Sequence, residues 1–445
     1  MPSFIKDATT TYITRVLFFL TSTISAIIIA RVLGPTNKGI FTLALLLPNL
    51  IFSIGHLGLG SAYTYYLGRK KYNFSTVLSN TFILSIVLGF SCIVITLILT
   101  FALRNSILRE IKLIYVFIAT MIIPFSLFLK YSQYILLGKQ LINKRNILLL
   151  IEGFSHLFLI IILVIFIKGK VYGALISNVG TILISSLLGL FFLLKISNSK
   201  LFPLRFNRNL FKDSILYGFK SCLALIILTL NYSADIFLIK YFLSNQEVGI
   251  YSIATSAAGA LWFLPASIGI VLFSYTPSFD KKTRDYLTPK VSRTSFLLSF
   301  LIAIILFFVA AQLIPLVFGP AYQNSIRPFQ ILLIGVLSIG LFKVLNGDLA
   351  GRGRPEIAFY VFSGALLLNI ILNIWWIPKF GTIGAAWAST ASYSFGAIIF
   401  TYVFHKITSI PIKDLIFVKK EDLKNYKKLI FYFLKNKVFK TKIKQ

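Results

Sequence analysis

The chain has 445 residues, of which 57% are hydrophobic and 13% charged, with a mean hydropathy of +0.85. A soluble domain carries about 25% charged residues, so the composition argues against a soluble enzyme or binding module. Apolar runs of about 20 residues, the length that crosses a hydrocarbon core, follow one another along the chain. The sequence therefore predicts an all-α polytopic membrane protein.

Twelve apolar segments, joined by short connections, predict twelve transmembrane helices. In chain order they lie near 13–32, 39–66, 79–102, 112–137, 147–167, 171–194, 213–240, 248–275, 294–316, 328–350, 355–377 and 382–405. Prolines inside three of them, at 48, 124 and 265, predict kinks because proline frees a backbone carbonyl.

The chain contains an internal repeat. Residues 31–44 read RVLGPTNKGIFTLA and residues 241–254 read YFLSNQEVGIYSIA, so that Gly39 matches Gly249 at an offset of 210. A second echo pairs Gly173 with Gly384 at an offset of 211. Six helices in each copy give both copies the same orientation, which predicts two parallel six-helix lobes around a central cavity, as in transporters.

We expect an N-lobe at 1–200, an inter-lobe loop at 201–212 on the cytoplasmic side, a C-lobe at 213–405 and a basic tail at 406–445. The tail mixes lysines with Leu, Ile and Phe at near-helical spacing. It either lies on an anionic inner leaflet as an amphipathic segment or is a solvated basic end that only fixes topology.

The formal net charge of +32 would suggest nucleic acid in a soluble protein, but here topology explains it. With the N-terminus in the cytoplasm, 32 of the 45 Lys and Arg residues fall on the inner side, 10 on the outer side and 3 within helices. This bias obeys the positive-inside rule. We therefore expect both termini in the cytoplasm of a bacterium, in its inner membrane, and no nucleic-acid partner.

Two of the three cations inside helices are related by the repeat. At an offset of 213, Lys130 falls on Lys343 and Gln133 falls on Asn346, and each amide shares a helix face with its lysine. A symmetric pair of cations suits an anion-binding cavity, lined also by the two amides. The alternative is that the lysines snorkel toward the interface, although their stems lean away from the near end.

Three further basic residues are candidates for the same anion site. Lys220 is about as deep, but its stem leans toward the near interface, which favours snorkelling. Arg15 and Arg31 bracket the first helix and either point into the vestibules at its two ends or anchor the helix at the interfaces.

Few acidic residues lie at membrane depth, where ionisable groups usually face a cavity or a partner. Asp235, and the i, i+4 pair Glu152 and His156, are candidates for coupling to a proton or sodium gradient; the alternative is structural hydrogen bonding. Asp348 is expected to be neutralised by Arg352 or Arg354.

Other chemistry finds little support in the sequence. The two cysteines and three histidines show no metal-ligand spacing. We expect no catalytic residues, no metal and no cofactor. A Walker A motif is absent from the sequence, as is the large outer loop that a membrane polymerase uses to hold its substrate.

Four segments resemble the polysaccharide-transporter branch of the multidrug/oligosaccharidyl-lipid/polysaccharide exporter superfamily, the flippases of O-antigen and capsule repeat units. They are ARVLGPTNKGIFTLA, GLGSAYTYYLGRK, DIFLIKYFLSNQEVGIYSIA and NIILNIWWIPKFGTIGAAWAST, within about residues 5–405. The family pattern covers positions to which it assigns no role: Arg31, Asp235, Gly249, Asn369, Asn373, Pro378 and Gly384.

The resemblance implies two lobes forming a V around a cationic lumen, and movement of an undecaprenyl-diphosphate-linked oligosaccharide by alternating access. It implies contact with membrane lipids, and a polysaccharide polymerase and chain-length regulator as partners of a monomer. Twelve helices rather than the fourteen of lipid II flippases disfavour a peptidoglycan precursor. Two alternatives stay open: a cation or drug antiporter of the same superfamily, or a membrane polysaccharide polymerase.

Overall fold

A computed structural model describes residues 2–197, 204–276, 280–419 and 421–422, with the side chains of residues 2–9, 220, 221 and 274 outside the description. Within these ranges the chain is helical and contains no strand. The N-terminal lobe consists of α1 (Pro2–Gly55), α2 (Leu59–Gly68), α3 (Phe74–Ala102), α4 (Leu113–Thr120), α5 (Ile123–Gly138), α6 (Ile142–Ile160), the π-helix η1 (Ile161–Phe166) and α7 (Lys170–Ser197).

The C-terminal lobe follows the inter-lobe connection. It consists of α8 (Arg208–Phe242), α9 (Asn245–Gly259), the 3₁₀ turn η2 (Ala260–Trp262), α10 (Phe263–Tyr275), α11 (Lys281–Phe318), the 3₁₀ segment η4 (Pro320–Ser325), α12 (Ile326–Gly351), α13 (Glu356–Thr408) and the short α14 (Ile412–Ile416).

Ten helical segments of the described chain are long and apolar enough to cross a membrane. Two of them, Thr10–Gly68 and Glu356–Thr408, are double crossings, because Gly34 (φ 68°) and Gly381 (φ 59°) adopt left-handed conformations that reverse the chain. Ten segments with two reversals give twelve crossings, so the predicted number of helices is confirmed. Pro124 follows the break between α4 and α5, and Pro265 follows η2.

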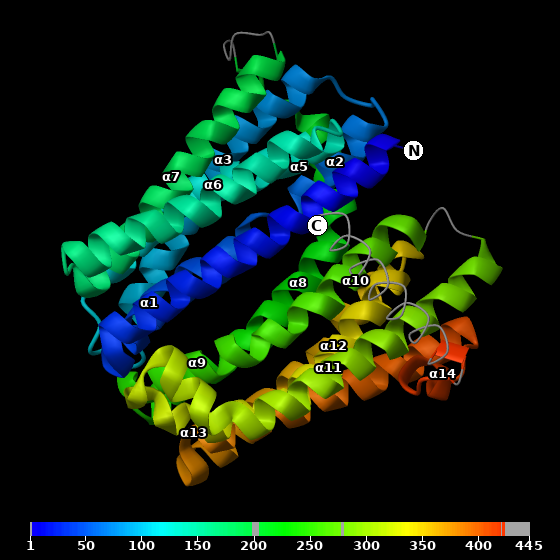
Figure 1. Cartoon of the computed structure of the whole chain (residues 1–445). Coiled ribbons are helices and arrows are strands. Elements are labelled where there is room, and N and C mark those ends of the chain that lie inside the picture. The colour runs from blue at the N-terminus through cyan, green and yellow to red at the C-terminus, as the bar shows by residue number, and fades with distance from the viewer. Residues whose placement is uncertain (1, 198–203, 277–279, 420, 423–445) are drawn as a thin grey trace, which may run out of the picture.

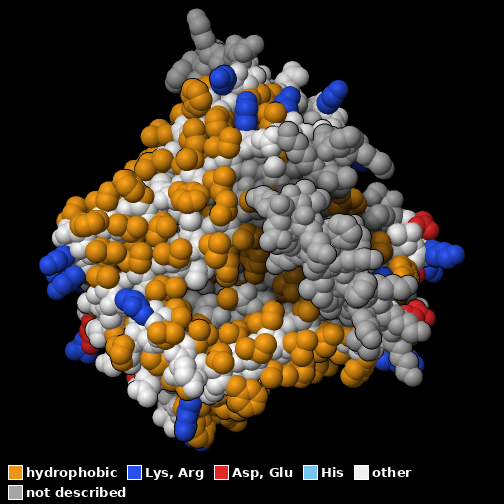
Figure 2. Space-filling view, viewed as in Figure 1, with side chains coloured by type: hydrophobic (Ala, Val, Ile, Leu, Met, Phe, Trp, Pro, Cys, Tyr) orange, Lys and Arg blue, Asp and Glu red, His pale blue; other side chains and the backbone are white. Residues whose placement is uncertain are grey.

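The two lobes form a V (Figure 1). They meet where α1 packs against α9, at the end of the molecule where α1 and α13 reverse direction, which we call the turn end. They diverge toward the opposite end, which contains the start of α1 and α14 and which we call the termini end. Figure 2 shows the face hollowed between the lobes, with apolar side chains over both lobes and basic side chains gathered toward the ends. The predicted two-lobed all-α fold is confirmed.

Helix α8 belongs to both lobes. Its first turns pack on α2, where Gly58 and Gly218 approach so closely that a Cβ on either would overlap the other's carbonyl group. Asp213 accepts hydrogen bonds from Lys71 (2.6 Å) and Tyr72 (2.7 Å), and these bonds, that of Lys71 first, lower the pKa of Asp213. The second half of α8 packs on α13 in the C-lobe. Because α8 packs on both lobes, a movement of one lobe against the other has to bend or shift α8.

Candidate functional site: a cationic cavity, a buried aspartate and a closed seam

A polar cavity of about 390 Å³ lies inside the N-lobe, between the second half of α1 and helices α5, α6 and α7. Lys130 and Gln133 of α5 line it together with Glu152 of α6 and Asn178 of α7. The Gln133 amide donates to the Glu152 carboxylate over 3.3 Å. Residues that the sequence assigned to substrate binding and to ion coupling thus share one cavity. His156, one turn further along α6, has a buried Nε2 atom with no hydrogen-bond partner among the described residues.

Lys130 also lines a second, smaller cavity of about 130 Å³ at the boundary between the lobes. There it shares the lining with His56 of the N-lobe and with Cys222 and Leu225 of α8. Its ammonium group lies 5.7 Å from the centre of the Tyr134 ring, one turn along α5. Lys130 therefore connects the N-lobe cavity with the helix that both lobes share.

Tyr134 links this lysine to two arginines. Arg15 of α1 and Arg145 of α6 are half-buried and close enough for their guanidinium groups to interact, and Arg145 also interacts with Tyr134. Neither arginine, nor Lys130, has a carboxylate within 4 Å among the described residues. Like charges held together in partly desolvated surroundings repel each other, and a bound anion relieves the repulsion. The three cations are called the N-lobe cation cluster below.

Lys343, the repeat counterpart of Lys130, has different surroundings. Its ammonium group lies over two aromatic rings, 5.0 Å from Trp262 and 5.8 Å from Tyr232. Tyr232 is on α8, seven residues beyond Leu225, or about 10 Å along the helix axis. Both lysines therefore lie beside α8 at different depths. Asn346, beside Lys343 on α12, has a buried Oδ1 atom without a partner in the described chain. The Lys220 side chain lies outside the described residues.

Asp235 on α8 is the most thoroughly hydrogen-bonded acid of the C-lobe, with a side chain that is 1% exposed. Its Oδ1 atom accepts from Asn369 (3.1 Å) and Asn373 (2.9 Å) of α13. Its Oδ2 atom accepts from Tyr251 of α9 (2.8 Å) and from Ser389 of α13. A carboxylate has about four lone-pair positions, so this group is saturated with donors that are all neutral. No cation balances its charge within the described ion pairs.

The repeat motif forms the seam between the lobes at the turn end. A Cβ on Gly39 would overlap the carbonyl oxygen of Asn245, and a Cβ on Gly249 would overlap the carbonyl oxygen of Pro35. These two contacts are equivalent under the internal repeat, because residues 35 and 39 become 245 and 249 at the repeat offset of 210. Two backbones can approach this closely only where side chains are missing. The glycines that revealed the repeat are therefore a point of backbone contact between the two copies.

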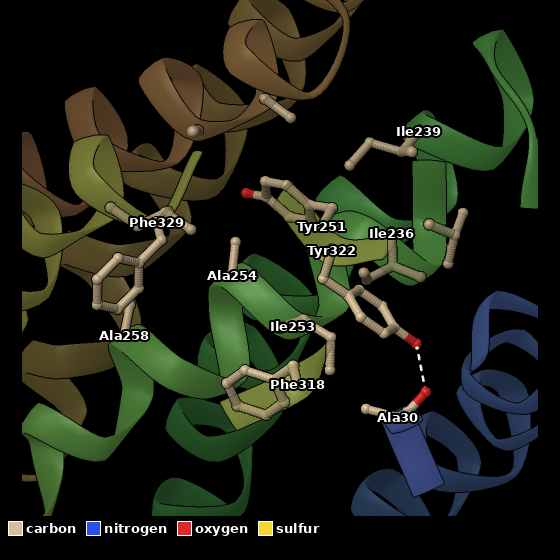
Figure 3. Packing of buried hydrophobic residues seen from close by; sticks show 14 of the residues in the cluster. Ala30, Ile236, Ile239, Tyr251, Ile253, Ala254, Ala258, Phe318, Tyr322 and Phe329 are labelled. Carbon is tan, nitrogen blue, oxygen red and sulfur yellow. Dashed lines mark hydrogen bonds between the residues drawn. The ribbon is translucent and has the colours of Figure 1, made fainter. Parts of the chain in front are cut away.

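Polar contacts lock the same seam. Tyr322 of η4 donates to the carbonyl oxygen of Ala30 over 3.0 Å (Figure 3). Arg31 donates to the carbonyl oxygens of Leu316 and Val317 at the end of α11. The structure thus places Arg31 in the seam, bonded to the opposite lobe, and away from the N-lobe cation cluster.

A residue in the loop between α3 and α4 forms an ion pair across the seam. Glu110 accepts from Lys240 (2.9 Å) and from Asn245 (2.7 Å) of the C-lobe. The hydrogen bond and charge of Lys240 lower the pKa of Glu110. The turn end is consequently closed by backbone packing, carbonyl bonds and an ion pair.

At the termini end, polar residues join helices within the C-lobe. Asp348 pairs with Arg352 over 2.7 Å, as predicted, and accepts from Thr276 and Thr288. This ties α10, α11 and α12 together. Both cysteines are buried and unpaired.

Sequence reasoning missed several residues of these sites. Arg145 lies in the first turn of α6, before the start of the apolar segment that predicts the fifth helix at 147–167. Tyr251 and Ser389, which bond Asp235, lie in the repeat motif and in the family pattern respectively, and those patterns were the available signal. Nothing in the local sequence indicates that they meet at one carboxylate.

Comparisons with known proteins agree with this geometry. Residues 4–280 match the family described as "Polysaccharide biosynthesis protein". The chain is 23% identical over 180 residues to the probable low-salt glycan biosynthesis flippase Agl15 of Haloferax volcanii, an alignment covering 40% of this chain and 38% of that flippase. The chain thus matches about two fifths of the length of this curated relative.

Two solved structures share the fold. The lipid II flippase MurJ in an inward closed conformation superposes with a TM-score of 0.72 at 18% identity, over 92% of this chain and 89% of that one. An inward-facing multidrug resistance transporter of the MATE family in the MOP superfamily superposes with a TM-score of 0.73 at 15% identity, over 88% and 94%. Both similarities concern the fold.

Proposed function

Because the chain belongs to the polysaccharide biosynthesis protein family of membrane transporters, we propose that it flips an undecaprenyl-diphosphate-linked oligosaccharide across a bacterial cytoplasmic membrane. The cargo would be a repeat unit of O-antigen or of capsular polysaccharide. The observation that carries the proposal is the N-lobe cation cluster, in which Arg15 and Arg145 interact and Tyr134 links Arg145 to Lys130. None of the three forms an ion pair within 4 Å in the described chain.

A diphosphate is the part of such a cargo that these cations would hold. Guanidinium groups bind phosphate oxygens in a fixed, forked geometry, and a lysine contributes a point charge. Lys343, about two turns further along α8, offers a second cation from the opposite lobe. The sugars would occupy the hollow between the lobes (Figure 2), and the lipid tail would stay in the bilayer, where it loses no hydrophobic contact.

Alternating access follows from the two ends of the V. The seam at the turn end is closed, while the lobes diverge at the termini end. With the termini in the cytoplasm, this is an inward-facing state that receives cargo from the inner leaflet. Release on the other side requires the seam around Gly39 and Gly249 to part and the termini end to close.

Asp235 is the residue we assign to energetic coupling. A proton or a cation such as Na⁺ would neutralise this buried carboxylate by taking the place of one of its neutral donors. The described oxygens near it include the unpartnered Oδ1 atom of Asn373 and the hydroxyl of Ser389, which suit a hard cation. Its bonds join α8, α9 and α13, so a change of its charge would act on the helix shared by both lobes.

The test replaces Lys130 and Lys343 together by Ala in a strain whose only copy of the gene is the variant. Surface polysaccharide should be lost while the protein remains in the membrane at its normal level. A matched control removes two exposed lysines of the termini end, Lys281 and Lys282, and should keep the polysaccharide. Normal polysaccharide in the Lys130/Lys343 variant would refute the assignment.

A drug antiporter is distinguished by ethidium efflux. We expect none, because Glu152 is the one carboxylate lining the N-lobe cavity and Gln133 already bonds to it. Efflux that depends on Glu152 would support the antiporter instead.

A further inference from the structure

An apolar groove of about 470 Å³ lies on the C-lobe, away from the proposed substrate site. Its walls come from four helices: α11 with Phe296, α12 with Leu341, α13 with Ile398 and Tyr402, and α14 with Ile416. Ile398 and Tyr402 are 69% and 52% exposed and therefore face whatever surrounds the protein. The volume is within the range of about 300–1,000 Å³ typical of ligand sites.

The side chains that line the groove favour a hydrocarbon as its occupant. Three hydroxyl groups line the groove, those of Ser338, Thr401 and Tyr402. Ser338 shares a hydrogen bond with Ser394 (3.1 Å), and Thr401 donates to the carbonyl oxygen of Ala397 (2.7 Å). Tyr402 is half exposed, so an apolar occupant need not bury its hydroxyl, whereas a sugar would find few groups to bond. In a membrane-spanning segment, the apolar molecule at hand is a lipid chain.

The mouth of the groove is basic. Lys406 follows Tyr402 by one turn of α13, and its ammonium group lies 5.6 Å from the centre of the Tyr402 ring. Lys413 follows Ile412, which also lines the groove. Both lysines are exposed, and neither forms an ion pair among the described residues. From Ala397 to Tyr402 the groove follows α13 for five residues, about 8 Å, and Lys406 lies one turn beyond it toward the termini end.

A buried ion pair holds α14, the fourth helix that lines the groove, in place. Arg293 of α11 binds both carboxylate oxygens of Asp422, over 2.5 and 2.9 Å, and both side chains are buried. Ser292 donates to the carbonyl oxygen of Leu415 in α14 (3.0 Å). The segment 409–419 is therefore docked against α11, and its Ile412 and Ile416 close the groove.

We propose that this groove binds an anionic phospholipid of the leaflet at the termini end, with an acyl chain against Ile398 and Ile416 and the phosphate between Lys406 and Lys413. The lipid fills the space between α13 and α14 and so fastens the docked C-terminal segment to the lobe. Charge at the mouth and hydrocarbon in the groove match the two parts of such a lipid. The inference does not depend on the proposed cargo.

The experiment measures lipid retained by the full-length protein in native mass spectrometry, after reconstitution in equal parts of phosphatidylglycerol and phosphatidylcholine. We expect one tightly retained phosphatidylglycerol, and a loss of at least about tenfold in its affinity, or 1.4 kcal/mol, in the variant Lys406→Gln with Lys413→Gln. Ile398→Trp, which narrows the groove, should weaken retention without changing charge. The control, Lys281→Gln with Lys282→Gln, removes two exposed lysines from the same end and should retain the lipid.

A second readout follows the docked segment. Amide hydrogen exchange in residues 410–417 should quicken in the Lys406/Lys413 variant and slow when phosphatidylglycerol is added to detergent-solubilised protein. Equal retention of phosphatidylcholine, unchanged retention in the Lys406/Lys413 variant, or protection by inorganic phosphate alone would each overturn the proposal. Displacement of phosphatidylglycerol by farnesyl diphosphate would also overturn it and would assign the groove to a prenyl chain.

Discussion

The two lobes are copies with the same backbone contacts but different polar sites. Gly39 and Gly249 make repeat-equivalent backbone contacts at the seam. By contrast, Asp235 of the C-lobe falls at the repeat offset of 210 on Ser25 of the N-lobe, a buried serine whose hydroxyl has no partner in the described chain. Lys130 lines cavities whereas Lys343 lies over two rings. The seam contact is thus repeated in both lobes, whereas the polar groups at membrane depth differ between them.

The largest effect is expected where the lobes are most alike. Gly39→Leu and Gly249→Leu should each reduce transport by more than about a hundredfold, or 2.7 kcal/mol, because a side chain cannot fit between the two backbones and the turn end cannot close. A cysteine introduced at Ala30 should then react with a membrane-impermeant thiol reagent added from the turn end.

Gly68→Leu is the control for this pair, because a Cβ at Gly68 meets no atom within 4 Å. Equal transport by the Gly39 and Gly68 variants would show that the seam is not a gate. A large difference between Gly39→Leu and Gly249→Leu would show that the two copies are not equivalent there.

Substitutions at Asp235 and at its repeat counterpart Ser25 test whether the polar sites of the two lobes differ. Asp235→Ala leaves four donors facing an apolar side chain, and unsatisfied buried groups cost about 1–3 kcal/mol each. We expect a lower midpoint of thermal unfolding in detergent and a loss of transport of at least about tenfold. Asp235→Asn should keep most of the stability and still lose transport. Ser25→Ala should change neither, since its hydroxyl has no described partner.

The two lysines should also differ. Lys130→Ala should weaken transport by about tenfold, because Lys130 lies in the cation cluster, and Lys343→Ala by less. Lys130→Arg should restore most of the activity, since charge is retained. The measurement is transport of a fluorescent lipid-linked oligosaccharide in vesicles; a greater loss from Lys343→Ala would reverse the roles assigned to the two lobes.

The smallest effect on closure of the seam is expected from a substitution at Glu110. Glu110→Gln removes an exposed partner of Lys240, and such pairs contribute about 0.2–1 kcal/mol. Because the folded state lowers the pKa of Glu110, this contribution is present above the ordinary glutamate value of about 4.3 and is lost as the pH falls through the lowered pKa. In a chain that carries Ala30→Cys, thiol labelling at residue 30 should therefore increase slightly on adding Glu110→Gln, and at acidic pH without it.

The fold could be predicted because its signals are local. A run of apolar residues long enough to cross the bilayer indicates a helix wherever it lies, and a repeat of residues at one offset indicates two copies. Lys130 and Asp235 could be singled out because charges are rare at membrane depth. Arg145 could not, because its position four residues into α6 looks like part of a basic loop.

By itself, the sequence determined the number of crossings, the duplication and the few charges at membrane depth, since each depends on the type of residue and its spacing along the chain. Only the tertiary structure decided which groups meet: Gly39 with Asn245, Arg31 with the end of α11, Asp235 with Ser389, and α14 with the groove of the C-lobe. These partners are separated by more than a hundred residues in the first three pairs. Their contact depends on how the helices pack, which no local pattern encodes.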